Sequence, residues 1–256
     1  TVPASATWPA KRSPWARALA LVAGGIAMGA ALLGWRPSIA PVVQTAGASV
    51  YNAATIERGR LLAAAGDCAV CHTAPDGTPN TGGRAMETPF GKVYTTNLTP
   101  DAETGIGQWS FSAFQRAMRE GISRDGKHLY PAFPYTSFAK MSDDDLTALY
   151  AYLMAQPAVR AEVPKTELTF PFSVRPLMAG WNALFHDATP FKPDPDRPPE
   201  WNRGAYLVRA WATAAPATRR AMRWGPSWVG LHSSRAPWWM AGRRLRSPAC
   251  RRRPCP

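Results

Sequence analysis

The chain is organised around the motif Cys68-Ala69-Val70-Cys71-His72. The spacing C-x-x-C-H is the attachment signature of a c-type haem. Two thiols one helical turn apart can each bond a vinyl group of a porphyrin, and the adjacent imidazole can reach the iron. The motif predicts one covalent haem c, with Cys68 and Cys71 as attachment points and His72 as the proximal iron ligand.

Two other kinds of site also use a C-x-x-C pair. A thioredoxin-like redox pair requires a βαβ setting, which this sequence does not predict. A zinc site requires two further ligands at knuckle spacing, and the other two cysteines, Cys250 and Cys255, lie far away in the C-terminal tail. The sequence therefore favours haem attachment.

The positive charge of the chain belongs to its C-terminal part. The formal net charge is +13, which would by itself suggest a nucleic acid or an anionic membrane as partner. Residues 203–256 contain 12 of the 30 basic residues, all of them arginine, and no acidic residue. The rest of the chain is nearly balanced in charge, so we expect no nucleic-acid partner.

An apolar run at residues 18–34 follows three basic residues and lies between Trp15 and Trp35. Basic residues before such a run direct the following chain across the membrane. The interpretations are a membrane anchor, favoured by the abrupt end at Arg36-Pro37, and a cleavable signal peptide. Both predict that residues 1–36 bring the chain to the periplasmic side of the bacterial inner membrane.

Hydrophobic periodicity predicts an all-α domain over residues 55–157, preceded by a linker at residues 37–54. The predicted helices are residues 56–65 after an N-cap at Thr55, residues 110–120 before a stop at Gly121, and a helix that begins at Ser142.

The helix that begins at Ser142 carries the clearest pattern in the chain. Ser142 and Asp145 form a capping box, and the following leucines lie on one face at helical spacing. We expect this face to pack against the helix at residues 56–65. Gly59 would let the two helices cross closely.

Residues 73–109 are rich in glycine, proline and threonine. Such a long irregular segment argues against a compact domain unless it surrounds something. We therefore expect it to wrap around a flat apolar cofactor.

A proline-rich linker is predicted at residues 158–201, with a short helix at residues 178–185. The following stretch, Trp201 to Val208, echoes Ile56 to Ala63. This internal repeat predicts that residues 202–256 contain the truncated start of a second domain of the same kind.

Residues 55–208 resemble the cytochrome c subunits of bacterial membrane-bound dehydrogenases. The shared motifs, in chain order, are C-A-V-C-H-T, T-P-F-G, Y-T-T-N-L-T-P, H-L-Y-P-A-F-P-Y, S-D-D-D-L-T-A-L-Y-A-Y-L, R-P-L-M-A-G-W-N and W-N-R-G-A-Y-L-V. Members serve periplasmic alcohol, gluconate and aldehyde dehydrogenases, and similar subunits serve molybdenum hydroxylases. The resemblance implies a class I cytochrome c-like domain, with two or three such haem domains in tandem.

In that family the last of these motifs leads to a second C-x-x-C-H, which residues 209–256 lack. Their arginine-rich, tryptophan-rich and aperiodic composition is typical of a GC-rich gene read out of frame. Trp211 before Ala212 forces glycine in the shifted frame, and the free wobble bases permit C-G-P-C-H shortly after it. We hypothesise a one-base deletion or a sequencing error near codons 208–209. The alternative is a genuine basic tail that binds an acidic partner, a membrane or nucleic acid. A block of like charge of this kind predicts a disordered tail.

The sixth iron ligand is not given by the motif. In the alcohol dehydrogenase branch of the family that this chain resembles, the sixth ligand is the methionine of a Y-P-A-M-P-Y motif. Phe133 occupies the corresponding position here. Met141, just before the last helix, is the candidate, and its alternative is a core residue before an N-cap. The further alternatives are His128, Met86 and an open sixth position, whereas Met118 and Met154 are expected in the core.

The resemblance implies an electron-transfer subunit that is not itself the enzyme. It would take electrons from a periplasmic dehydrogenase catalytic subunit and pass them to quinone or a downstream oxidase at the cytoplasmic membrane. The alternative is a haem enzyme or haem sensor with an open or weakly ligated iron site, because Phe133 cannot ligate. No group of residues in the sequence forms a catalytic constellation.

Overall fold

The computed structural model describes residues 51–211, residues 34–42 and single residues between 15 and 29. The tail from residue 212 and most of the predicted anchor lie outside the described residues. Within the described part, no helix is long and apolar enough to cross a membrane.

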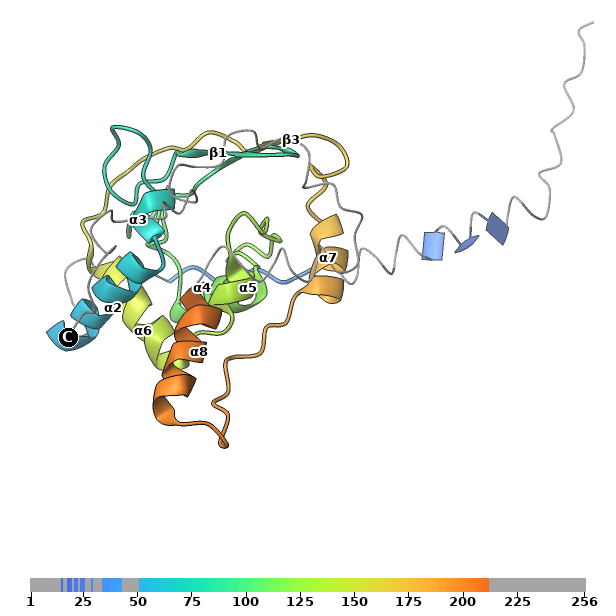
Figure 1. Cartoon of the computed structure of the whole chain (residues 1–256). Coiled ribbons are helices and arrows are strands. Elements are labelled where there is room, and N and C mark those ends of the chain that lie inside the picture. Colours follow the sequence, from blue (N-terminus) through green and yellow to red (C-terminus); the bar gives the residue numbers. More distant parts are fainter. Residues whose placement is uncertain are drawn as a thin grey trace, which may run out of the picture.

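The described residues form a mostly helical domain with one small sheet (Figure 1). In chain order its elements are α2 (Ala53–Ala65), α3 (Cys68–Cys71), β1 (Ala85–Thr88), β2 (Gly91–Tyr94), α4 (Phe111–Glu120), α5 (Tyr135–Phe138), α6 (Asp143–Ala155), β3 (Glu167–Leu168), α7 (Leu177–Phe185) and α8 (Pro199–Trp211).

Helices α2 and α6 cross closely and form the centre of the domain, as the sequence predicts. A Cβ atom at Gly59 of α2 would lie 1.9 Å from the carbonyl oxygen of Ala148 in α6, so only glycine fits at this crossing. The N-cap of α2 is Asn52, whose side chain accepts a hydrogen bond from the Thr55 backbone N–H. The prediction of Thr55 as the N-cap is wrong, because Asn52 offers an equally good capping side chain one turn earlier.

The predicted stop at Gly121 and the predicted start at Ser142 are confirmed, and α4 begins one residue after the predicted start. Ser110 caps α4 by accepting from the backbone N–H of Ala113, and Gly121 ends it in the left-handed conformation. Ser142 caps α6 by accepting from the backbone N–H of Asp145. The inward faces of α4 and α6 then join one apolar core.

A three-stranded antiparallel sheet is the feature that the all-α expectation does not include. Strands β1 and β2 form a hairpin through Pro89 and Phe90, and β2 pairs with β3 from the segment predicted as a linker. The hairpin requires Gly91, because its φ is 126° and a Cβ there would lie 2.2 Å from the carbonyl oxygen of Glu167.

Helix α8, predicted to start a second domain, packs on the first domain. Tyr206, Ala210 and Trp211 are buried members of the same apolar core as α4 and α6. The Tyr206 hydroxyl donates to the Asp145 carboxylate and accepts from the backbone N–H of Ser142 at 3.2 Å. This helix therefore contacts the N-terminal end of α6 and the loop that precedes it.

Candidate haem site

The predicted attachment motif forms a single turn of helix, α3, directly after α2. Gly66 ends α2, and Asp67 then adopts a left-handed conformation that redirects the chain into α3. Two backbone hydrogen bonds close the turn. The Cys71 N–H donates to the Asp67 carbonyl at 3.2 Å, and the His72 N–H donates to the Cys68 carbonyl at 2.8 Å. Residues three apart lie on one face of a helix, so Cys68 and Cys71 are placed together.

Cys68 and Cys71 form no disulfide, and both side chains are half-buried. Burial raises the pKa of the Cys68 thiol to about 12, and burial also raises the pKa of Cys71. A redox C-x-x-C pair instead needs a thiol pKa well below the ordinary value. The surroundings of these two thiols therefore argue against a thioredoxin-like role.

His72 is oriented by a hydrogen bond from its ring. Its Nδ1 lies 2.6 Å from the carbonyl oxygen of Thr96. A carbonyl oxygen only accepts, so Nδ1 carries the proton and the neutral ring keeps a lone pair on Nε2. Burial lowers the pKa of His72, which also favours the neutral imidazole. A neutral ring with a fixed tautomer is what a haem iron ligand requires.

The Thr96 carbonyl is itself held in place by the next residue. Asn97 is buried, and its side-chain amide donates to the carbonyl of Val159 at 2.8 Å and to the Thr104 hydroxyl at 3.0 Å. Its side-chain oxygen accepts from the Thr99 N–H and hydroxyl. Thr96 and Asn97 belong to Y-T-T-N-L-T-P, but the sequence alone assigns them no role. The sequence feature that could have pointed to this role is the side-chain amide of Asn97, which lies between threonines in the segment expected to surround the cofactor.

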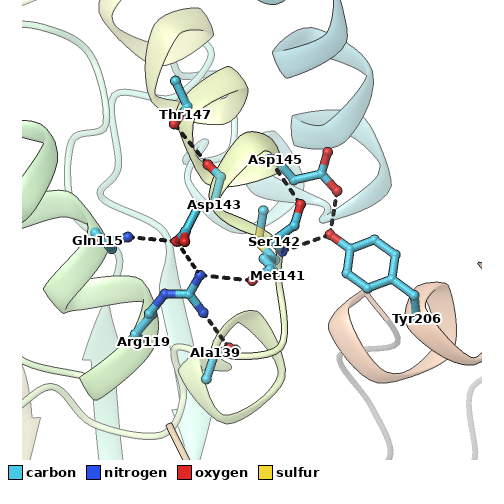
Figure 2. Close-up of polar contacts among 9 residues, drawn as sticks. All are labelled: Gln115, Arg119, Ala139, Met141, Ser142, Asp143, Asp145, Thr147 and Tyr206. Atoms are coloured by element: carbon cyan, nitrogen blue, oxygen red, sulfur yellow. Dashed lines mark hydrogen bonds and ion pairs between the residues drawn. The ribbon is translucent and has the colours of Figure 1, made fainter. Parts of the chain in front are cut away.

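The loop that carries Met141 is fixed on both sides of that residue (Figure 2). Met141 is completely buried in the same core cluster against which Cys68 packs. The Arg119 guanidinium donates to the carbonyls of Ala139 and Met141 at 2.8 and 3.0 Å and pairs with Asp143 at 2.7 Å. On the other side of Met141, the Tyr206 hydroxyl accepts a hydrogen bond from the backbone N–H of Ser142.

The other residues considered as iron ligands have different surroundings. His128 is buried, and its Nε2 donates to the Gly34 carbonyl at 3.1 Å. Met118 is buried in the core and Met154 is half-buried against it, as predicted. Met86 lies on β1, and Phe133 packs at the edge of the core.

Two thiols on one helical turn, followed by an imidazole with a fixed tautomer, are the arrangement that proteins with a c-type haem use for attachment. The donor set and the orientation of His72 both fit a covalently bound haem.

Comparison with known proteins agrees with this reading of the site. Residues 56–157 match the family model of cytochrome c, which assigns a cytochrome c domain to this stretch. The chain is 59% identical over 208 residues to a nicotinate dehydrogenase component of Pseudomonas putida, a match that covers 80% of this chain and 17% of that protein. It is 45% identical over 159 residues to the gluconate 2-dehydrogenase cytochrome c subunit of Pantoea cypripedii, covering 61% and 36% of the two chains.

A third relative is a diheme cytochrome c-type protein of Cereibacter sphaeroides. It is 38% identical over 157 residues, which cover 59% of this chain and 52% of the relative. The chain therefore spans between 17% and 52% of the length of these three relatives.

Proposed function

We propose that this chain is the electron-transfer part of a dehydrogenase complex and that it carries one haem c. Cys68 and Cys71 form the thioethers, and Nε2 of His72 binds the iron. The observation that carries the proposal is the hydrogen bond from His72 Nδ1 to Thr96, because it leaves Nε2 free to ligate. When bound, the haem supplies one-electron chemistry between ferric and ferrous iron.

The residues of the chain have three tasks in this function. The α3 turn fixes the position of the cofactor, since both attachment points belong to one helical turn. The Thr96 and Asn97 loop keeps the His72 ring from rotating. The core that includes Leu98, Trp109 and Met141 provides apolar surroundings, and such surroundings help to set a haem reduction potential.

For the sixth position we propose Met141. Its support is the rigid placement of its backbone between Arg119 and Tyr206, together with its location in the core cluster that Cys68 contacts. Methionine ligation is the usual choice for electron transfer, because it raises the potential of the haem.

The proposed electron donor is the catalytic subunit of a periplasmic dehydrogenase, and the acceptor is quinone or a downstream oxidase at the cytoplasmic membrane. The names of the relatives point to nicotinate or gluconate as substrate classes of the catalytic partner. The chain is 59% identical to the nicotinate dehydrogenase component and 45% identical to the gluconate 2-dehydrogenase subunit. We therefore propose a dehydrogenase that acts on an N-heterocycle as the first candidate for the partner.

Haem reduction by the partner tests this function. The haem-loaded chain is mixed with the dehydrogenase catalytic subunit, and the absorption of ferrous haem is followed after nicotinate is added. The proposal expects rapid reduction that depends on both the catalytic subunit and the substrate. A haem that is reduced by a chemical reductant, but not by this mixture, would reject the proposed donor.

A further inference from the structure

Helix α7 exposes leucine side chains on the outside of the domain. Its sequence, Leu-Met-Ala-Gly-Trp-Asn-Ala-Leu-Phe, contains one polar side chain and no charge. That polar residue, Asn182, faces the domain, where it accepts from the Tyr135 hydroxyl at 2.6 Å and donates to the Glu120 carbonyl at 3.3 Å. Leu177 and Leu184 face outward and are 57% and 76% exposed. Surface helices in water normally show the opposite arrangement.

The loop before α7 extends this apolar surface. Phe170 is 83% exposed, and the half-exposed ring of Phe172 stacks on Phe90 with ring centroids 4.1 Å apart. From Thr169 to Phe185 the only charged residue is Arg175. Its guanidinium turns inward to the His128 carbonyl, at 3.0 Å, and to the Tyr130 ring.

We name the surface formed by Phe90, Phe170, Phe172, Leu177 and Leu184 the α7 face. Helix α7, which carries two of these residues, lies on the side of the domain opposite α2 and α3 (Figure 1). Exposed apolar side chains on an uncharged stretch of this kind point to a site of interaction.

The chain enters the domain directly beside the α7 face. A Cβ atom at Gly34 would lie 3.6 Å from Cβ of Pro176 and 3.8 Å from Cβ of Ala179, and the Gly34 carbonyl accepts from His128. The segment that follows is fixed to the domain, since Arg116 donates to the Pro37 carbonyl and the Ile39 N–H donates to the Arg124 carbonyl, both at 2.8 Å. The apolar run at residues 18–34 therefore ends at a point that is rigidly placed next to α7, and not on a free linker.

We propose that the α7 face lies on the surface of the lipid bilayer, with Phe170, Leu177 and Leu184 at the boundary between headgroups and acyl chains. The inference rests on the proposed membrane location of the chain, and it adds which face of the domain meets the lipid. Exposed aromatic and leucine side chains are favoured at this depth, and Trp35 is 69% exposed at the same entry point. This placement turns α2 and α3, and with them the haem attachment turn, to the side of the domain away from the bilayer surface (Figure 1).

Photo-crosslinking of the haem-loaded full chain tests the placement. The photoreactive residue p-benzoylphenylalanine replaces Phe170, Leu184 or, as matched control, Leu61, a leucine of α2 that is 56% exposed. Each variant is reconstituted in vesicles of phosphatidylethanolamine and phosphatidylglycerol and illuminated, and adducts are identified by mass spectrometry. Because all three side chains face outward, the haem spectrum should stay that of the wild type.

The expected result is a lipid adduct at positions 170 and 184 in several-fold higher yield than at position 61. Protein that stays with the vesicles but gives equal or no lipid adducts at 170 and 184 overturns the inference and leaves the membrane location standing. Protein that washes off the vesicles overturns both. In membranes of the producing bacterium, an adduct between position 184 and another protein would assign the α7 face to a partner subunit and overturn the inference.

Discussion

His72 donates the proton on its Nδ1 to the carbonyl oxygen of Thr96 across 2.6 Å. This bond connects the attachment motif to a loop 24 residues further along the chain. It orients the ring and decides which ring nitrogen can bind a metal. Asn97 fixes the loop by its contacts to Val159 and Thr104, so the chemistry of His72 depends on residues well beyond the motif.

Replacing His72 with glycine should remove the proximal nitrogen while both thioethers remain. The oxidised variant should lose the low-spin haem spectrum, and added imidazole should restore it by binding in the space of the lost ring. Absorption spectra with and without imidazole measure this. The control is His186→Gly, at a half-buried histidine whose Nε2 donates to the Arg119 carbonyl; this variant should keep the wild-type spectrum. A low-spin spectrum in His72→Gly without imidazole would contradict the assignment.

Gly59→Ala should strongly destabilise the domain, since the added methyl group would lie 1.9 Å from the Ala148 carbonyl oxygen. Forcing α2 and α6 apart is expected to lower the free energy of unfolding by about 3 kcal/mol. The matched control is Gly204→Ala in α8, where a Cβ meets nothing within 4 Å. That change should raise stability by up to about 1 kcal/mol, because alanine is the better helix former. Denaturant unfolding of both variants gives the comparison, and equal effects would refute the tight crossing.

The sequence predicts the helices of this domain because their signals are local. Gly121 and Ser142 are each recognisable as caps within one turn of the helix that they limit, and the structure confirms both. The predicted N-cap of α2 is wrong because Asn52 and Thr55 are both good capping residues only three positions apart.

The sheet is not predicted, for a different reason. Strand β3 pairs with a hairpin far away in sequence, as in Gly91 opposite Leu168, and no local pattern records such a pairing.

The candidate site shows the same division between local and distant information. Cys68, Cys71 and His72 follow from their spacing alone. Thr96 contributes a backbone carbonyl, which any residue at that position would supply, so its role leaves no trace in its side chain. The contact of α8 with Asp145 depends on the packing of two segments 61 residues apart, and no local pattern records such a contact.

Tyr206→Phe should weaken the attachment of α8 to the domain. The hydroxyl donates to Asp145, which is 2% exposed and also pairs with Arg58 at 2.6 Å, and it accepts from the Ser142 N–H. Burial, and then the neighbouring carboxylate, raise the pKa of Tyr206, so the phenol remains a donor. Without it a buried oxygen and a backbone N–H each lose a partner, which should cost about 1–3 kcal/mol. Thermal unfolding measures the loss. Tyr152→Phe, on the same helix as Asp145 but outside this network, should change stability less.

Met141→Leu tests the proposed sixth ligand. The swap conserves volume, so its cost in stability should stay below about 1.5 kcal/mol. The oxidised variant should lose the weak red charge-transfer band of methionine-ligated haem, its reduction potential should fall, and the ferrous form should bind carbon monoxide readily. Met118→Leu, at another buried methionine of the same core, should keep the band. Persistence of the band in Met141→Leu would show that a different residue ligates the iron.

Stability should decrease as the pH falls through the range in which histidine normally titrates, and His128 should contribute to this. His128 is 4% exposed, and its Nε2 donates to the Gly34 carbonyl. Burial above all, and also the charge of Arg36, hold the pKa of His128 below its ordinary value of 6.5. As the pH falls through 6.5, the unfolded chain therefore takes up a proton that the folded chain does not bind. The contribution of neutral His128 to the free energy of unfolding is complete above pH 6.5 and is lost as the pH falls toward the lowered pKa. His128→Gln removes this titration, so its free energy of unfolding should fall less steeply between about pH 8 and pH 5. Burial lowers the pKa of His186 as well, so the slope should be reduced and not abolished. Equal slopes in the two proteins, measured by denaturant unfolding across this range, would show that His128 is not the group responsible.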